Sequence, residues 1–140
     1  MKYKRFKDKI VLRLEVGEDI GDELAKLANV ENIKLASVSG IGATDDFSIG
    51  VFDPEKGSYD RFDHKGDHEI TALVGNITTM DGKPYLHLHI TCAASDGTVC
   101  AGHLIRSRIS LTAEIVVDII EGELIRKRSE ELNINLIDFE

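Results

Sequence analysis

The sequence predicts a single-domain α/β protein (α+β type) in which one main helix packs on a β-sheet. The length of 140 residues is typical of one domain, and 42% hydrophobic residues are enough to close one core without disulfides or structural metals. One segment has apolar residues at helical spacing, and several others are β-rich runs separated by turn-forming residues. We therefore expect one compact domain over residues 1–140.

The helix is predicted near the amino terminus, directly after a strand. Residues 10–16 (IVLRLEV) alternate in part between apolar and polar side chains, as in a half-buried strand. Gly17 then interrupts the strand, and Asp19 can cap a helix that runs over about residues 20–28. The apolar residues of this helix recur at helical spacing and predict one face packed on a sheet. They are Ile20, Leu24, Leu27 and Ala28.

The rest of the chain is predicted to be mostly strands. The β-rich runs are residues 34–38, 46–52, 68–78, 85–93, 98–105 and 111–120. Residues 39–42 (Ser-Gly-Ile-Gly) are interpreted as a flexible turn. Residues 53–57 and 80–84 are rich in turn formers and predict loops, and a short strand is expected at residues 135–139 of the tail.

Charge and cysteine content restrict the class of protein. The net charge of −8 and pI near 5.1 disfavour binding to a phosphate backbone, and the short basic runs at residues 2–9 and 126–128 are interpreted as solvated faces. The amino terminus lacks the apolar segment of a secretory signal, and no apolar run could cross a bilayer. We expect a cytoplasmic protein without a membrane partner, in which Cys92 and Cys100 stay reduced.

Two histidines in the run His87-Leu88-His89 are candidate metal ligands. On a strand both side chains point to the same face, with Cα atoms roughly 6.6 Å apart at a rise of about 3.3 Å per residue. Two imidazoles so placed can converge on one ion. The alternative interpretation of this pattern alone is an exposed polar strand face.

Whether His103 joins them depends on the loop of the hairpin that connects residues 85–93 and 98–105. A two-residue loop would place His103 opposite Ile90, on the wrong face. A three-residue loop at residues 95–97 pairs Ala94 with Thr98 and sets His89 opposite His103. Gly97 favours the three-residue loop, because the common form ends in a residue with left-handed backbone conformation.

The three-residue loop places three imidazoles on one polar face, with the core on the other. Three neutral histidines with an open fourth position are typical of a zinc site that accepts a ligand, at Zn–N distances of about 2.0 to 2.1 Å. Nickel, manganese, iron or cobalt would also fit these ligands. His64 and His68 lie in a polar stretch and are interpreted as surface residues.

The motifs around these histidines resemble the plants-and-prokaryotes conserved (PPC) domain family, whose signature is an H-x-H strand leading to a G-G-H-L strand. The matching segments cover nearly the whole chain in the family order. They are residues 14–19 (LEVGED), 39–43 (SGIGA), 69–77 (EITALVGNI), 81–84 (DGKP), 87–89 (HLH) and 101–104 (AGHL). Two departures are Ala94, where many members have Asp, and Ala101, which replaces a glycine.

The resemblance implies a largely antiparallel sheet, assembly as a homotrimer, and a metal bound by His87, His89 and His103. Plant members carry AT-hook segments that bind DNA, but the Arg-Gly-Arg-Pro core of an AT-hook does not occur in this sequence. The leading hypothesis is a trimeric zinc-binding protein with a structural metal or a small anionic ligand at the metal. The alternatives are a DNA-binding or transcription-related regulator and a metal-dependent hydrolase or lyase.

Three further patterns are weaker candidates for function. Gly40-x-Gly42 lacks the third glycine and the following helix of a phosphate-binding loop. Cys92 and Cys100 would lie directly across the predicted hairpin, either as a redox pair or, in their apolar surroundings, as inert buried thiols. Glu69 is either a base near the metal or a surface carboxylate.

Overall fold

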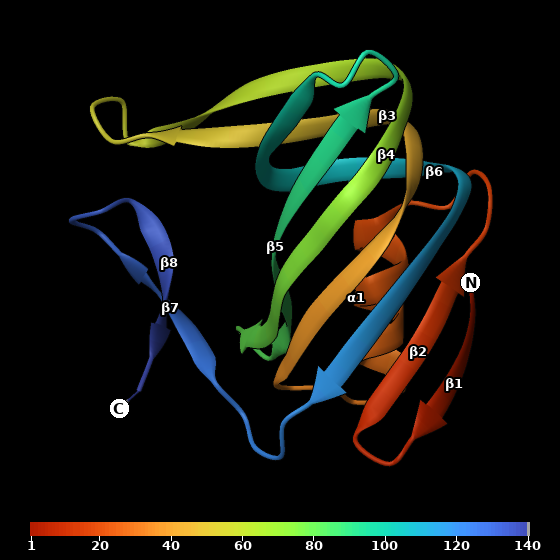
Figure 1. Cartoon of the computed structure of the whole chain (residues 1–140). Coiled ribbons are helices and arrows are strands. Elements are labelled where there is room, and N and C mark those ends of the chain that lie inside the picture. Colours follow the sequence, from red (N-terminus) through yellow and green to blue (C-terminus); the bar gives the residue numbers. More distant parts are fainter. Residues whose placement is uncertain (140) are drawn as a thin grey trace.

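The strands form one highly bent sheet with the order β1-β2-β6-β3-β4-β7-β8, and β5 pairs with both β4 and β6 (Figure 1). The structure is a computed structural model that describes residues 1–139. In chain order the elements are β1 (Lys2–Phe6), β2 (Lys9–Leu14), α1 (Ile20–Val30), β3 (Ala36–Asp53), β4 (Ser58–Met80), β5 (Lys83–Ala94), β6 (Val99–Ile119), β7 (Ile125–Ser129) and β8 (Ile134–Asp138). All pairings are antiparallel apart from one parallel bridge between β4 and β7. The predicted α/β fold with one main helix on a largely antiparallel sheet is confirmed.

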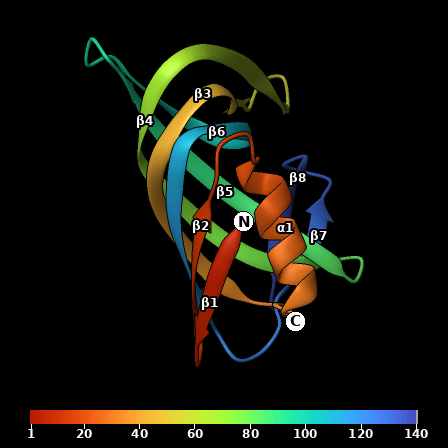
Figure 2. The same ribbon diagram turned by 90° about the vertical axis from the view of Figure 1, so that its right-hand side faces the viewer.

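Helix α1 covers one face of the sheet (Figure 2). Asp19 is its N-cap as predicted, and its side chain accepts hydrogen bonds from the backbone N–H groups of Gly21 and Asp22. The four apolar residues predicted to face the sheet are fully buried and join inward-facing residues of the strands in one core. α1 is also the longest helix within residues 1–139, and none there could span a membrane.

Long bends in β3, β4 and β6 close part of the sheet on itself. β3 pairs with β4, β4 with β5, β5 with β6, and β6 with β3. We call this closed circuit the strand ring. The bends coincide with register shifts, of which three lie in β3 between Gly40 and Asp46, as expected for β-bulges.

Two predictions about element boundaries are wrong. Residues 39–42 are not a turn but part of the continuous strand β3, because Gly40 and Gly42 let its backbone approach β6 closely. A Cβ at Gly42 would lie 2.5 Å from the carbonyl oxygen of Thr112. Residues 98–105 and 111–120 likewise belong to one strand, β6, which bends instead of ending.

The chain ends form two hairpins, each containing one strand that was missed. β1 was missed beside the predicted β2, and β7 beside the predicted tail strand, now β8. The β7–β8 hairpin stands apart from the helix, on the far side of β5 (Figure 1). It lies close to the tip of the β3–β4 hairpin, where the side-chain amide of Asn133 donates to the carbonyl of Gly57 at 2.5 Å.

Candidate metal centre

The β5–β6 hairpin has the predicted three-residue loop. The N–H of Ala94 donates to the Thr98 carbonyl at 2.8 Å, and Gly97 has φ +83°. His89 is therefore paired with His103, and Cys92 with Cys100 on the opposite face. The register that decides whether His103 can join the other two histidines is confirmed.

The imidazoles of His87, His89 and His103 converge at this point of the sheet. One ring nitrogen of each lies within 4.8 Å of the others, and the ring centroids are 5.3 to 5.6 Å apart. Tetrahedral zinc needs nitrogens about 3.4 Å apart, given Zn–N bonds of about 2.0 to 2.1 Å. Small side-chain rotations would cover this difference.

Burial keeps two of the histidines neutral, which is the form that binds a metal. Desolvation lowers the pKa of His103 to about 4, with the nearby His87 and His89 adding to the effect. Desolvation and the charge of Arg126 also lower the pKa of His87. Nδ1 of His103 is buried without a hydrogen-bond partner within residues 1–139. Two neutral imidazoles, one of them with an orphaned nitrogen, fit a metal ion.

Arg126 was predicted to lie on a solvated face, but it is buried beside the triad. Its guanidinium donates to the side-chain oxygens of Thr78 and Asn76 and to the carbonyl of Asn135, each at 2.9 Å, and it stacks on the ring of Tyr85. One of its nitrogens lies 3.4 Å from Nδ1 of His87. The prediction failed because most contacts that bury Arg126 come from β4 and β5, far from β7 in the sequence.

A cavity of about 360 Å³ opens beside the histidines, between the β3–β4 tip and the β7–β8 hairpin. Its lining residues are Phe52, Gly57, Ser58, Tyr59, Tyr85, His87, His103, Arg126, Arg128, Asn133, Ile134, Asn135 and Leu136. Two arginines and two tyrosines thus face the cavity, whereas no carboxylate lines it within residues 1–139. This lining suits a small anion.

Glu69, His64 and His68 lie away from the triad and its cavity. Glu69 is exposed and does not line the cavity. His64 and His68 are half-buried, not surface residues, and their ring nitrogens gather with the thiol of Cys100 in a separate cluster. Sequence spacing could not reveal this cluster, because its residues are brought together by the bends of β4 and β6.

Comparisons with known proteins agree with the fold. The family model described as "Plants and Prokaryotes Conserved (PCC) domain" matches residues 1–121. A "putative DNA binding protein" from Bacteroides thetaiotaomicron is 31% identical with a TM-score of 0.96, covering 99% of this chain and 96% of its own. No curated protein sequence matches the chain.

Two archaeal structures are also similar. A plant- and prokaryote-conserved (PPC) protein from Pyrococcus horikoshii is 28% identical with a TM-score of 0.87, covering 98% of this chain and 93% of its own. A metal-containing protein from Archaeoglobus fulgidus is 28% identical with a TM-score of 0.86, covering 97% of this chain and 96% of its own.

Proposed function

We propose a function from the family to which this chain belongs, the Plants and Prokaryotes Conserved (PCC) domain family. The chain is a homotrimeric zinc-binding protein that receives a small anion beside the metal. His87, His89 and His103 would hold the ion. The observation that carries the proposal is the pairing of His89 with His103, which brings three imidazole nitrogens within 4.8 Å of one another. The name of the metal-containing Archaeoglobus protein supports it.

The anion would bind in the cavity next to the histidines. Zinc held by three protein ligands supplies an open coordination position and Lewis acidity. Arg126 and Arg128 add positive charge, and the hydroxyl groups of Tyr59 and Tyr85 add hydrogen-bond donors. Hydrolysis would need a general base, but within residues 1–139 the cavity lining has no carboxylate, and its two histidines are the proposed metal ligands.

The trimer is supported by the face of the sheet that α1 leaves uncovered. Strand pairing places Val11, Val116, Ser39, Val74 and His89 in one row across this face. The valines are 36 to 52% exposed. Exposed apolar rows of this kind are typical of contacts between identical subunits.

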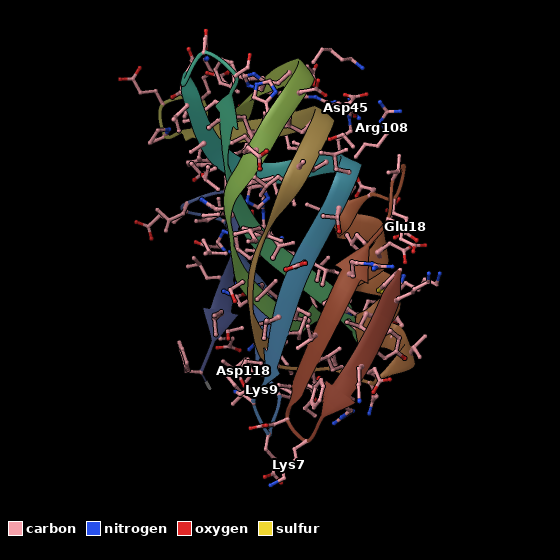
Figure 3. All side chains as sticks on the ribbon, turned by 45° about the vertical axis from the view of Figure 1, so that its right-hand side comes forward. Lys7, Lys9, Glu18, Asp45, Arg108 and Asp118 are labelled. Carbon is pink, nitrogen blue, oxygen red and sulfur yellow. The ribbon has the colours of Figure 1, made fainter. Side chains whose placement is uncertain are left out.

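DNA binding is the second candidate, favoured by the name of the Bacteroides structure. The local charge argues against it, because most basic side chains of the β1–β2 hairpin are paired with carboxylates. Lys9 contacts Asp118, as Figure 3 shows, while Arg5 contacts Glu31 and Lys2 contacts Glu15. These pairs leave little free positive charge for phosphates.

The test of the proposal is the metal content of the protein purified without added ions. His89→Ala is the informative variant, because this ligand is exposed and its removal leaves the core intact. We expect this variant to lose one zinc ion per chain relative to the unaltered protein, as measured by elemental mass spectrometry. Thr91→Ala, at the next outward-facing position of β5, should keep the full content. Equal metal content in the unaltered protein and the His89→Ala variant would refute the proposal.

A further inference from the structure

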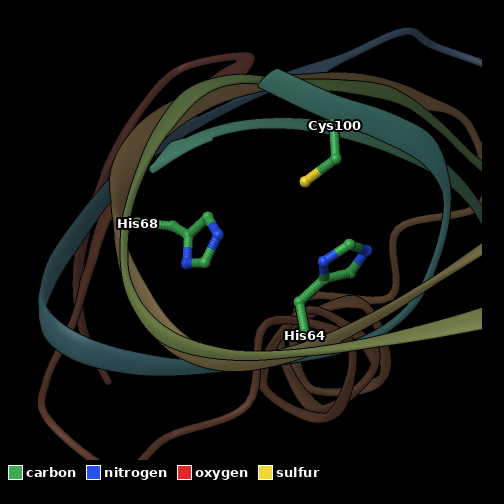
Figure 4. A group of neighbouring side chains, drawn as sticks. All are labelled: His64, His68 and Cys100. Carbon is green, nitrogen blue, oxygen red and sulfur yellow. The ribbon is translucent and has the colours of Figure 1, made fainter. Parts of the chain in front are cut away.

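We propose that His64, His68 and Cys100 form a second transition-metal site inside the strand ring, independent of the histidine triad. One ligand atom of each residue lies within 4.8 Å of those of the other two. Figure 4 shows both imidazoles and the thiol directed into the space that the strands enclose. The two histidines come from β4 and the cysteine from β6.

Strand pairing explains why the three side chains share this interior. Cys100 is paired with the fully buried Cys92, and His64 with the fully buried Phe47. His68 lies two residues before Ile70, which is also buried and paired with Cys92. Alternation along the strands thus directs all three toward the core side, opposite to His89 and His103.

Contacts around the histidines orient them as metal ligands usually are. Nδ1 of His68 lies 2.7 Å from the carbonyl oxygen of Gly66, so Nδ1 carries the proton and Nε2 keeps the lone pair. Metal-binding histidines typically donate a hydrogen bond from the N–H of their second ring nitrogen in this way. The ring of His64 stacks on Phe47 with centroids 4.8 Å apart, which fixes its plane.

The cluster has unsatisfied polar atoms that a metal would help to explain. Nε2 of His64 is buried and has no hydrogen-bond partner within residues 1–139. The thiol of Cys100 has only a weak contact, 3.8 Å from the Cys92 carbonyl oxygen. This half-buried cluster of two imidazoles and one thiol therefore has few hydrogen bonds from the protein itself. The alternative to metal binding is that these three side chains only pack the interior of the strand ring.

The ligand types select the metal. Two imidazoles and one thiolate suit zinc, cobalt or copper(I) and do not suit calcium or magnesium. Burial raises the pKa of Cys100, but a coordinating metal ion displaces the thiol proton. His68 also borders a surface hollow of about 430 Å³ with Asp67 and Glu69, whose carboxyl groups offer cations an acidic approach.

Cobalt(II) distinguishes the two sites, because only the second one contains sulfur. Titration of the metal-free protein with cobalt chloride should give a near-ultraviolet thiolate-to-cobalt charge-transfer band. We expect the band in the unaltered protein and in His89→Ala, and its loss in Cys100→Ser. His64→Gln and His68→Gln should each weaken cobalt binding at this site by at least about tenfold. Mutation of residues that only hydrogen-bond to metal ligands already costs about that much affinity. Cys92→Ser is the control and should keep the band.

Three results would overturn the proposal. They are absence of the band from the unaltered protein, its persistence in Cys100→Ser, and its loss in His89→Ala, which would assign the sulfur to the triad. Circular dichroism checks the folding of each variant. If Cys100→Ser does not fold, protection of Cys100 from iodoacetamide by zinc is measured in the unaltered protein, and full alkylation in the presence of zinc refutes the site. A failed triad leaves the cobalt–sulfur band unaffected, so the two proposals fail separately.

Discussion

At the scale of single residues, burial determines which protonation state the candidate metal ligands have before a metal arrives. His103 is half-buried, faces two other imidazoles and has a pKa of about 4. Neutral imidazole is the ligand form, so the site is ready for a cation at neutral pH without a proton being removed first. Desolvation, followed by the charge of Arg126, likewise lowers the pKa of His87.

This burial predicts a pH-dependent stability of the metal-free protein. In the unfolded chain His103 titrates near its usual value of 6.5, whereas in the folded protein it titrates at about 4. Between these two pH values the unfolded chain binds more protons than the folded protein. The free energy of unfolding is therefore highest above pH 6.5 and decreases as the pH falls toward 4. Denaturant unfolding of chelator-treated protein at neutral pH and near pH 5 measures this decrease in the free energy of unfolding. His103→Gln should lose less stability on acidification, and an equal loss in both proteins would contradict the account.

Sequence reasoning placed the triad correctly but missed its surroundings. The alternation of a strand fixes the shared face of His87 and His89, and Gly97 indicates the loop length that adds His103. Arg126 and His64 could not be placed in this way. Arg126 meets His87 and Thr78 across 39 and 48 residues, and the neighbours of His64 depend on the bulged pairing of β3 with β4; no local pattern determines these contacts.

At the scale of elements, the β7–β8 hairpin is attached to the rest of the fold at few points. One bridge joins Thr79 to Ile125, and the buried guanidinium of Arg126 adds hydrogen bonds to β4 and β8. The same hairpin forms one wall of the anion cavity. The position of this wall therefore depends strongly on one buried charged side chain, beside the hydrogen bonds of Asn133 to Gly57 and of Asn135 to Tyr85.

Arg126→Met should loosen the hairpin and abolish anion binding together. Removing a charged donor from partners in a buried site costs about 2 to 3 kcal/mol. We expect faster proteolytic cleavage within residues 122–139 and loss of phosphate binding by calorimetry. Arg128→Gln is the matched control, since Arg128 is exposed and bonded to Asn133 within the hairpin; it should weaken phosphate binding without faster cleavage. Unchanged cleavage in Arg126→Met would show that the guanidinium does not anchor the hairpin.

The strands show where local signals are overridden. Helix α1 was predicted closely, because its cap and its apolar spacing are local. The glycines at 40 and 42 have the composition of a turn, yet they serve close contact between β3 and β6. Residues 106–110 (RSRIS) likewise gave no strand signal, although β6 continues through them in its bend. Tertiary pairing decides both cases.

At the scale of the whole molecule, one face of the sheet is covered by α1 and the other is an uncovered apolar surface. The row from Val11 to Val74 ends at His89, so the face proposed for subunit contact borders the proposed metal centre. Assembly would therefore bring a neighbouring chain close to the metal. The overall α/β class followed from composition and periodicity, whereas the closure of the strand ring did not.

Val74→Lys should disrupt the trimer, because it places a charge at the most exposed valine of the apolar row. Light scattering after size-exclusion chromatography should show the mass falling from three chains to one chain of 15.5 kDa. Val30→Lys, an equally severe change at the end of α1, should leave the trimer intact. A trimer that survives Val74→Lys would place the interface elsewhere.

The most direct test of the central claim is anomalous X-ray scattering at the zinc edge from crystals of the unaltered protein. The account predicts a peak bonded to one ring nitrogen each of His87, His89 and His103, next to the cavity that contains Arg126. A map of zinc-loaded crystals with no peak among these three imidazoles would contradict it.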